Sequence, residues 1–192
     1  MNSETAAAII GASAGIVGAV VGGTGAVAAA RVTASKGAKA AQEQWHRQSR
    51  REAYAKLILV SQDVAEDLHR FHRAVQEGNL SRDYAAETYA RLTERMTEVR
   101  AAKIAAEIEG PDDMDRFTGP VLINLLRAIE GIHPDGLVED GGQLILPEQF
   151  EKGFGRVGFA ISDLTWCARE ILSARDITSA SHLRPPFWDC TR

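Results

Sequence analysis

The stretch Tyr54–Val75, YAKLILVSQDVAEDLHRFHRAV, has the pattern that decides the fold. Its apolar positions recur at alternating spacings of three and four residues, which is typical of a helix that buries one face against other helices. One polar residue, Ser61, interrupts this pattern. The stretch therefore predicts a helix in a bundle, with an inward face made of Tyr54, Leu57, Ser61, Val64, Leu68, Phe71 and Val75.

A second helix is expected after the glycine and asparagine at residues 78–79, which end the first one. Ser81 is a suitable N-cap for it, because serine side chains accept hydrogen bonds from the free N–H groups of a first helical turn. The pair Gly110–Pro111 ends this helix. Its predicted apolar face consists of Tyr89, Leu92, Met96, Val99 and Ala106.

Two more helices are expected in the second half of the chain. The acidic run 112–115 favours the start of a third helix, since negative charge stabilises a helix N-terminus. This helix is expected to hold Pro120 near its first turn, where proline is tolerated, and to stop at residues 133–134. A fourth helix follows Pro147, which suits a first helical position. The apolar residues of the two helices are Phe117, Val121, Leu122, Leu125, Leu126, Ile129 and Ile132, and then Phe150, Phe154, Val157, Ile161, Leu164, Ile171 and Leu172.

The connection 135–146 is glycine-rich and predicts a loop, with residues 144–146 as a short extended piece. Four amphipathic helices with short connections predict an antiparallel bundle. We therefore expect an all-α fold: an N-terminal Gly/Ala-rich transmembrane helix followed by an antiparallel helical bundle of about four helices. The expected divisions are a transmembrane segment (1–31), a basic juxtamembrane helix (32–53), the bundle (54–176) and a polar, proline-aromatic tail (177–192).

Residues 5–30, TAAAIIGASAGIVGAVVGGTGAVAAA, contain no charged side chain. About 20 apolar residues suffice to cross the hydrocarbon core of a bilayer as a helix. At 100° per residue, five of the glycines fall within roughly 80° of arc, opposite a face of isoleucine and valine. Small residues on one face let helices approach closely in lipid. We predict a membrane span with a packing face made of Gly11, Gly15, Gly18, Gly22 and Gly25.

Three other interpretations of residues 5–30 fit less well. A cleaved secretory signal would begin with basic residues, whereas residues 1–4 carry only Glu4, although the small residues 28–30 leave cleavage open. A dinucleotide-binding loop requires G-x-G-x-x-G, but the spacing here is G-x-x-x-G-x-x-G. A buried helix of a soluble protein would lose about 1 kcal/mol at each glycine relative to alanine.

Basic residues follow the predicted span, beginning with Arg31, Lys36 and Lys39. Because basic residues next to a span stay in the cytoplasm, we expect a single-pass protein of the inner (cell) membrane with a short N-terminus outside and a cytoplasmic C-terminal domain. The same three residues form a candidate site for anionic lipid headgroups, with a solvated helix face as the equal alternative. Trp45 lies about 20 Å beyond the span on a straight helix, so we expect a packing residue there.

The span and the basic helix WHRQSRREAY, residues 45–54, together have a recognisable composition. They resemble a loose group of uncharacterised single-span membrane proteins of high-GC actinobacteria and their mobile elements. The likeness covers about residues 5–75 and is compositional. It implies membrane anchoring and a helical cytoplasmic part, and it brings no catalytic residues.

Two Glu-x-x-His motifs suggest a carboxylate-bridged metal site, which helical bundles build from such motifs. The first, residues 66–69, lies off the inward face, and the second, residues 130–133, lies at a helix end. His69 and His72 would bind zinc only with ligands from elsewhere, and we expect them to be exposed. We therefore predict no metal, no cofactor and no catalytic residue, and we do not expect an enzyme.

The chain has two cysteines, Cys167 and Cys190. We expect two free thiols, with Cys167 buried and inert, and a bridge between them is the alternative if the domain lies outside the cytoplasm. A formal net charge of −4 argues against a nucleic-acid partner. Near the C-terminus, the stiff pair Pro185–Pro186 precedes Phe187 and Trp188, which favours aromatics folded back onto the bundle over a docking peptide.

These features predict a membrane-anchored helical interaction or scaffold protein that associates through its glycine-faced span. The expected partner is a second copy of the chain or another membrane protein. The alternative is a membrane-perturbing or pore-forming effector assembled from the same spans, and an enzyme with a site inside the bundle ranks third.

Overall fold

The computed structural model describes the backbone of residues 3–78, 80–140 and 143–173, and the side chains of residues 33–78, 80–138 and 145–173. The chain divides into two compact units, Met1–His46 and Arg47–Arg192. The predicted divisions at residues 31, 53 and 176 stay predictions. The second unit contains the bundle.

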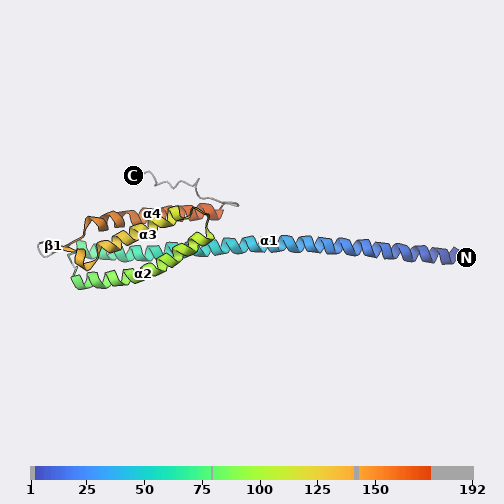
Figure 1. The fold of residues 1–192 in the computed structure, drawn as a ribbon, viewed down its shortest axis with the longest axis horizontal. Helices are drawn as coiled ribbons and strands as arrows, with labels where there is room; N and C mark the ends of the chain where they lie inside the picture. Colours follow the sequence, from blue (N-terminus) through green and yellow to red (C-terminus); the bar gives the residue numbers. More distant parts are fainter. Residues whose placement is uncertain (1–2, 79, 141–142, 174–192) are drawn as a thin grey trace. The chain divides into compact units, whose positions relative to one another are not determined.

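The bundle consists of four helices, drawn in Figure 1. They are α1 (Ser3–Gln76), which enters the bundle at Arg47, α2 (Arg82–Glu109), α3 (Asp115–Gly131) and α4 (Glu148–Ser173). A 3-10 turn, η1 (Pro134–Gly136), and an antiparallel pair of short strands, β1 (Val138–Asp140) and β2 (Gln143–Ile145), connect α3 to α4. The predicted all-helical bundle is thus confirmed, and the predicted loop 135–146 contains a small hairpin.

The turn between α1 and α2 forms as predicted. Gly78 has a φ of 70°, a left-handed conformation that glycine adopts without steric cost. The Ser81 hydroxyl accepts a hydrogen bond from the Tyr84 N–H at 3.1 Å, which confirms the N-cap of α2. These two local features reverse the chain and set α2 antiparallel to α1.

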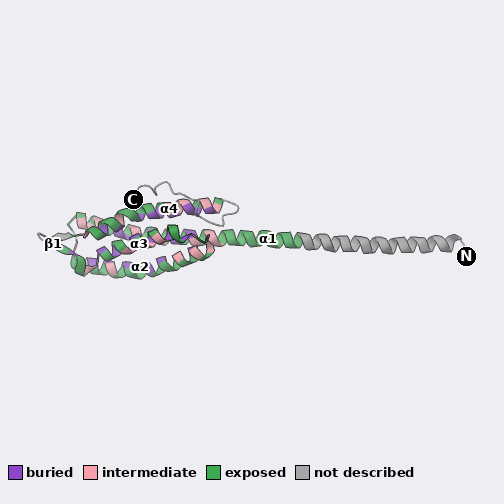
Figure 2. Ribbon diagram, turned by 45° about the horizontal axis from the view of Figure 1, so that its top comes forward, coloured by how far each residue is buried: buried purple, intermediate pink, exposed green. Residues whose placement is uncertain are grey.

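The core is formed by the inward faces of all four helices, where the buried positions of Figure 2 gather. The seam predicted for residues 54–75 is confirmed, since every position is buried except Val75, which is half-buried. The predicted apolar faces of α2, α3 and α4 are likewise buried or half-buried at every position. Burial of these side chains is the main favourable contribution to folding.

Charged side chains join α1 to α2. The Asp67 carboxylate is buried, and it forms ion pairs with Arg70 at 2.7 Å, Arg95 at 3.0 Å and Arg91 at 3.8 Å. Near the other end of α2, the Nε of Arg50 donates a hydrogen bond to the Glu109 carbonyl at 2.7 Å. A cation at the carbonyl end of a helix also interacts favourably with the helix dipole.

Helices α3 and α4 form the most closely packed helix pair. A Cβ placed on Gly153 would lie 2.7 Å from the backbone nitrogen of Ala128, and one on Gly131 would lie 2.6 Å from the Cβ of Phe150. Any larger side chain would force the helices apart, since Cβ contacts this short are essentially never seen. The glycines therefore set the separation of α3 and α4 at the end nearer the hairpin.

One expectation about a single residue is wrong. Trp45, expected to be a packing residue, is 62% exposed, and its ring meets the neighbouring His46 ring edge to face. Pro120 is the sixth residue of α3, which begins at Asp115, so it lies just after the first turn. The proline ring removes the N–H that would have bonded to the Arg116 carbonyl.

The membrane span falls outside what the structure tests. From Thr33 onward, where side chains are described, no helix is long and apolar enough to cross a bilayer. The predicted span at residues 5–30, its glycine face and Arg31 lie outside the described side chains. The predicted tail, with Phe187, Trp188 and Cys190, also lies outside the described residues.

Candidate functional site

The metal-site candidates are not brought together. Glu66 and His69 are exposed on α1, as predicted, while His133 pairs with Asp135 at 3.8 Å and its ring lies 4.7 Å from the ring of Tyr89. Among the described residues, no group of three or more potential ligands is close enough to hold a metal ion.

The expectation of an exposed His72 is wrong, because this ring is half-buried against α4. Its ring centroid lies 5.0 Å from that of Phe154 and 5.7 Å from that of Phe150. The Nε2 of His72 lies 3.4 Å from a carboxylate oxygen of Glu151. His72 therefore packs α1 against α4, whereas the neighbouring His69 stays exposed and contacts Phe154 edge-on.

Cys167 is a fully buried free thiol on α4, as predicted. Burial raises the pKa of its thiol to about 12, with smaller contributions from the carboxylates of Asp113 and Glu170. A thiol that stays protonated at neutral pH is a poor nucleophile. The predicted lipid-contact residues Lys36 and Lys39 are exposed, and their role stays a prediction.

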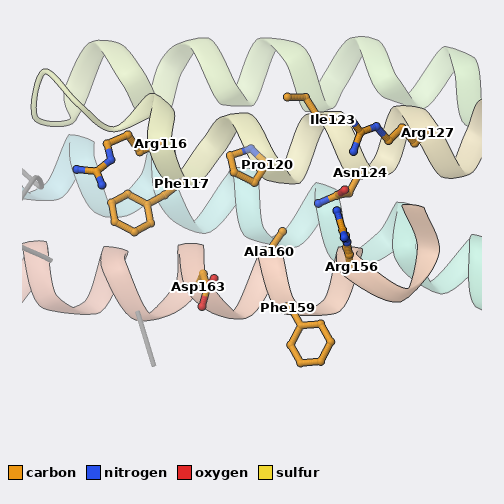
Figure 3. Close-up of a pocket in the computed structure, with 10 residues that line it drawn as sticks. All are labelled: Arg116, Phe117, Pro120, Ile123, Asn124, Arg127, Arg156, Phe159, Ala160 and Asp163. Carbon is orange, nitrogen blue, oxygen red and sulfur yellow. The ribbon is translucent and has the colours of Figure 1, made fainter. Parts of the chain in front are cut away.

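The principal candidate site is a groove between α3 and α4, with a cavity of about 330 Å³ (Figure 3). A cavity of this size lies at the lower end of the range of ligand sites in proteins, roughly 300–1,000 Å³. We call it the α3–α4 groove. Its lining residues are Arg116, Phe117, Pro120, Ile123, Asn124 and Arg127 from α3, and Arg156, Phe159, Ala160 and Asp163 from α4.

Large apolar side chains of the groove remain in water. Ile123 is 48% exposed and Phe159 is 47% exposed, although each lies on a helix with a well-buried apolar face. In Figure 3 the Phe159 ring points away from the bundle. Exposed apolar side chains gathered at a hollow are typical of interaction surfaces.

Three arginines surround this apolar surface. Arg116 pairs with Asp113 at 3.9 Å. Within the described part of the chain, the guanidinium groups of Arg127 and Arg156 have neither an ion pair nor a hydrogen bond. Gly153 explains their proximity, because a Cβ added to it would lie only 3.0 Å from the Cβ of Arg127, and Arg156 follows one turn later on α4.

Two polar side chains in the groove have unused hydrogen-bonding capacity. Asn124 is only 8% exposed, and its side-chain amide has no hydrogen-bond partner among the described residues. In Figure 3 the side chains of Asn124 and Arg156 point toward one another across the groove. The Oδ1 of Asp163 is buried without a described partner, and burial raises the pKa of this carboxyl. Such groups bind polar atoms of a ligand when one is present.

A second hollow, of about 470 Å³, lies between α1 and α4 and is more open to solvent. It has two basic residues, Arg51 and Arg169, and its apolar wall includes Ile58. Tyr54 also lines it, but the hydroxyl of this residue lies close to Gly110, at the end of α2. The α3–α4 groove, with the nearly buried Asn124 and its exposed apolar side chains, is the stronger candidate.

Sequence reasoning missed the α3–α4 groove entirely. A signal was present in the positions of Ile123 and Phe159, which fall outside the apolar faces predicted for their helices. No protein-family model, curated protein or solved structure matches the chain. Fold and site together define a four-helix bundle that presents a basic, partly apolar groove.

Proposed function

We propose that this protein is a membrane-anchored helical interaction protein that associates through a glycine-faced span. The observation that carries the proposal is the arc of five glycines within the charge-free run 5–30. Residues 5–30 lie within α1, which supports placing them on a helix with 100° between successive residues. Close approach of small-residue faces is a common way for helices to associate in lipid.

The charges after the run support a cytoplasmic bundle and a short external N-terminus. Lys36 and Lys39 are exposed, which is compatible with contact to anionic headgroups. The partner at the span is a second copy of the chain or another membrane protein. No catalytic residue, cofactor or nucleic-acid partner enters this proposal.

The proposal is tested by flotation and crosslinking of the full chain in lipid. The protein should float with neutral liposomes in a density gradient and should crosslink to itself in membranes. Replacing Gly15, Gly18 and Gly22 by isoleucine should reduce this crosslinking at least about tenfold, because the β-branched side chains would separate the helices. The matched control places isoleucine at Val17, Val20 and Val27, which lie on the other side of the helix, and should crosslink normally.

Two outcomes would overturn the proposal. Unchanged crosslinking of the glycine variant would refute the glycine packing face. A full chain that stays monomeric in the supernatant without detergent would refute membrane anchoring. Leakage of dye from liposomes, abolished by the same glycine substitutions, would favour the pore-forming effector instead.

A further inference from the structure

We propose that the α3–α4 groove binds an amphipathic helix of a partner protein, with acidic side chains at both ends of its contacting face. This inference rests on the proposed function, an interaction protein, and adds the chemistry of the partner that the bundle recognises. It is carried by the order of charged and apolar side chains along α3, by the two unpaired cations Arg127 and Arg156, and by the nearly buried Asn124.

The side chains of α3 that line the groove form one stripe. Arg116, Pro120, Ile123 and Arg127 are separated by four, three and four residues, so they share one helix face. The stripe reads cation, apolar, apolar, cation. At 1.5 Å per residue, the two arginines begin about 16 Å apart along the helix axis.

A partner helix laid along this stripe needs the complementary order: acid, apolar, apolar, acid at the same spacings. Binding of an amphipathic helix in a groove is a recurring mode of peptide recognition. Arginine suits the acidic ends because its planar guanidinium donates two parallel hydrogen bonds to a carboxylate. Arg127 and Arg156 have no such acceptor within the described part of the chain. A carboxylate of the partner at this end of the groove would therefore face both guanidinium groups.

At the centre of the groove, the partner helix must supply apolar side chains and at least one polar side chain. Ile123 and Phe159 supply exposed apolar surface on either side of the hollow. Asn124 supplies a nearly buried amide without a described partner, which can both donate to and accept from a polar side chain of the partner helix. The Oδ1 of Asp163 can accept one further hydrogen bond.

The arrangement favours a helix over a small molecule. A small-molecule site encloses most of its ligand, whereas the apolar surface here continues outside the hollow onto side chains that are nearly half exposed, Ile123 and Phe159. Arg116 lies at one end of the groove and Arg127 and Arg156 lie at the other, so the three cations do not converge on one point (Figure 3). Both features fit an elongated partner with charges about three helical turns apart.

The probe is a fluorescent, acetylated and amidated helical peptide of about 16 residues. It carries Glu at its third and fourteenth positions, Leu at the seventh and tenth, and Ala and Gln elsewhere, which reproduces the required spacing. The control peptide has Lys in place of both Glu residues. Binding is measured by fluorescence anisotropy with the full-length protein in dodecyl maltoside, at low and at physiological salt.

The acidic peptide should bind at least about tenfold more tightly than the lysine peptide, and the preference should shrink as salt screens the charges. Arg127→Ala and Arg156→Ala should each weaken binding of the acidic peptide about tenfold. Arg100→Ala, which removes an exposed arginine of α2 outside the groove, should leave binding unchanged. The double variant R127E/R156E should reverse the preference toward the lysine peptide.

Equal binding of the two peptides, or equal effects of the groove and Arg100 variants, would overturn the proposal. So would tight binding of octanoate at the groove without binding of the acidic peptide, which would indicate a small-carboxylate site. The assay requires no association between spans. Unchanged crosslinking of the glycine variant would therefore refute the proposed function, whereas equal binding of the two peptides alone would refute only the assigned partner.

Discussion

The α1–α2 pair and the α3–α4 pair treat their charges in opposite ways. Between α1 and α2, the buried Asp67 carboxylate is surrounded by three arginines at 2.7–3.8 Å, and Asp63 adds a pair to Arg95 at 3.1 Å. Between α3 and α4, glycines bring the backbones together at one end, and two arginines of the open groove, Arg127 and Arg156, have no ion-pair or hydrogen-bond partner in the described residues.

The difference separates charged groups that pair with each other inside the bundle from charged groups that have no partner within it. A carboxylate inside a bundle must be paired, because removing an ion from water without compensation is costly. Arginines at an exposed groove need no internal partner, since water solvates them until an anion arrives. The first helix pair therefore pairs its charges internally, whereas Arg127 and Arg156 of the second remain accessible, as the proposed partner helix requires.

Substitution Asp67→Ala should give the largest loss of stability, about 3 kcal/mol. It removes one carboxylate from three arginines and leaves a polar pocket in a buried position. Chemical denaturation of the full chain, followed by circular dichroism, measures the change. Asp63→Asn is the matched control, and its cost should stay below about 1 kcal/mol because this side chain is 55% exposed. Equal losses would mean that burial does not distinguish the two carboxylates.

Substitution Gly153→Ala should destabilise the bundle by about 1–2 kcal/mol. The added methyl group would lie 2.7 Å from the Ala128 nitrogen, and the cost of overpacking exceeds the gain in helix propensity. Gly155→Ala, on another face of the same helix with nothing within 4 Å of its Cβ, should stabilise by about 1 kcal/mol. The same unfolding curves compare the two variants. If both variants were stabilised, or both destabilised, the result would contradict a close contact at Gly153.

Substitution Thr88→Val should stabilise the bundle by about 1 kcal/mol. The Thr88 hydroxyl of α2 is fully buried without a described hydrogen-bond partner, and valine keeps the shape while removing the unsatisfied group. Thermal unfolding in parallel with the wild type provides the measurement. A loss of stability in the valine variant would show that the hydroxyl has a partner, such as a bound water molecule.

At neutral pH the smallest effect is expected from the buried tyrosine and cysteine, because both stay protonated. Burial raises the pKa of Tyr54 to about 12 from about 10 and that of Cys167 to about 12 from about 9. The unfolded chain therefore loses these protons first, so stability is complete below about pH 9 and falls as the pH rises toward 12.

Absorbance titration of the tyrosines and denaturation between about pH 8 and 12 test this window. In a Cys190→Ser background, iodoacetamide should modify Cys167 only after unfolding. Rapid labelling of the folded variant at about pH 8 would contradict the buried, protonated thiol.

The helices were predictable because their apolar residues repeat at helical spacing over many turns. The face from Tyr54 to Phe71 and the cap at Ser81 depend on local sequence alone, and the structure confirms both. The residue at which α3 starts, Asp115, was less predictable, because helix ends are weakly specified by sequence. The packing of His72 on Phe150 depended on a contact between helices distant in the chain.

The α3–α4 groove was not predictable from any one segment. Arg127 and Arg156 occupy polar positions that look like ordinary solvated helix faces, and only the close approach at Gly153 brings them together. Gly153 and Gly155 are only two residues apart on α4, and the sequence alone does not show which of them meets α3. That distinction requires knowing which face of α4 meets α3.

The glycine contacts at residues 131 and 153 also make one end of the α3–α4 pair stiffer than the other. The other end, where α3 starts, is joined to α2: the Thr118 hydroxyl donates a hydrogen bond to Glu107 at 2.6 Å, and Asp115 pairs with Lys103 at 3.0 Å. Glu107 and Lys103 both belong to α2. If binding in the groove displaces α3, we therefore expect the displacement at the start of α3, where it would shift α2, and not at the end near the hairpin.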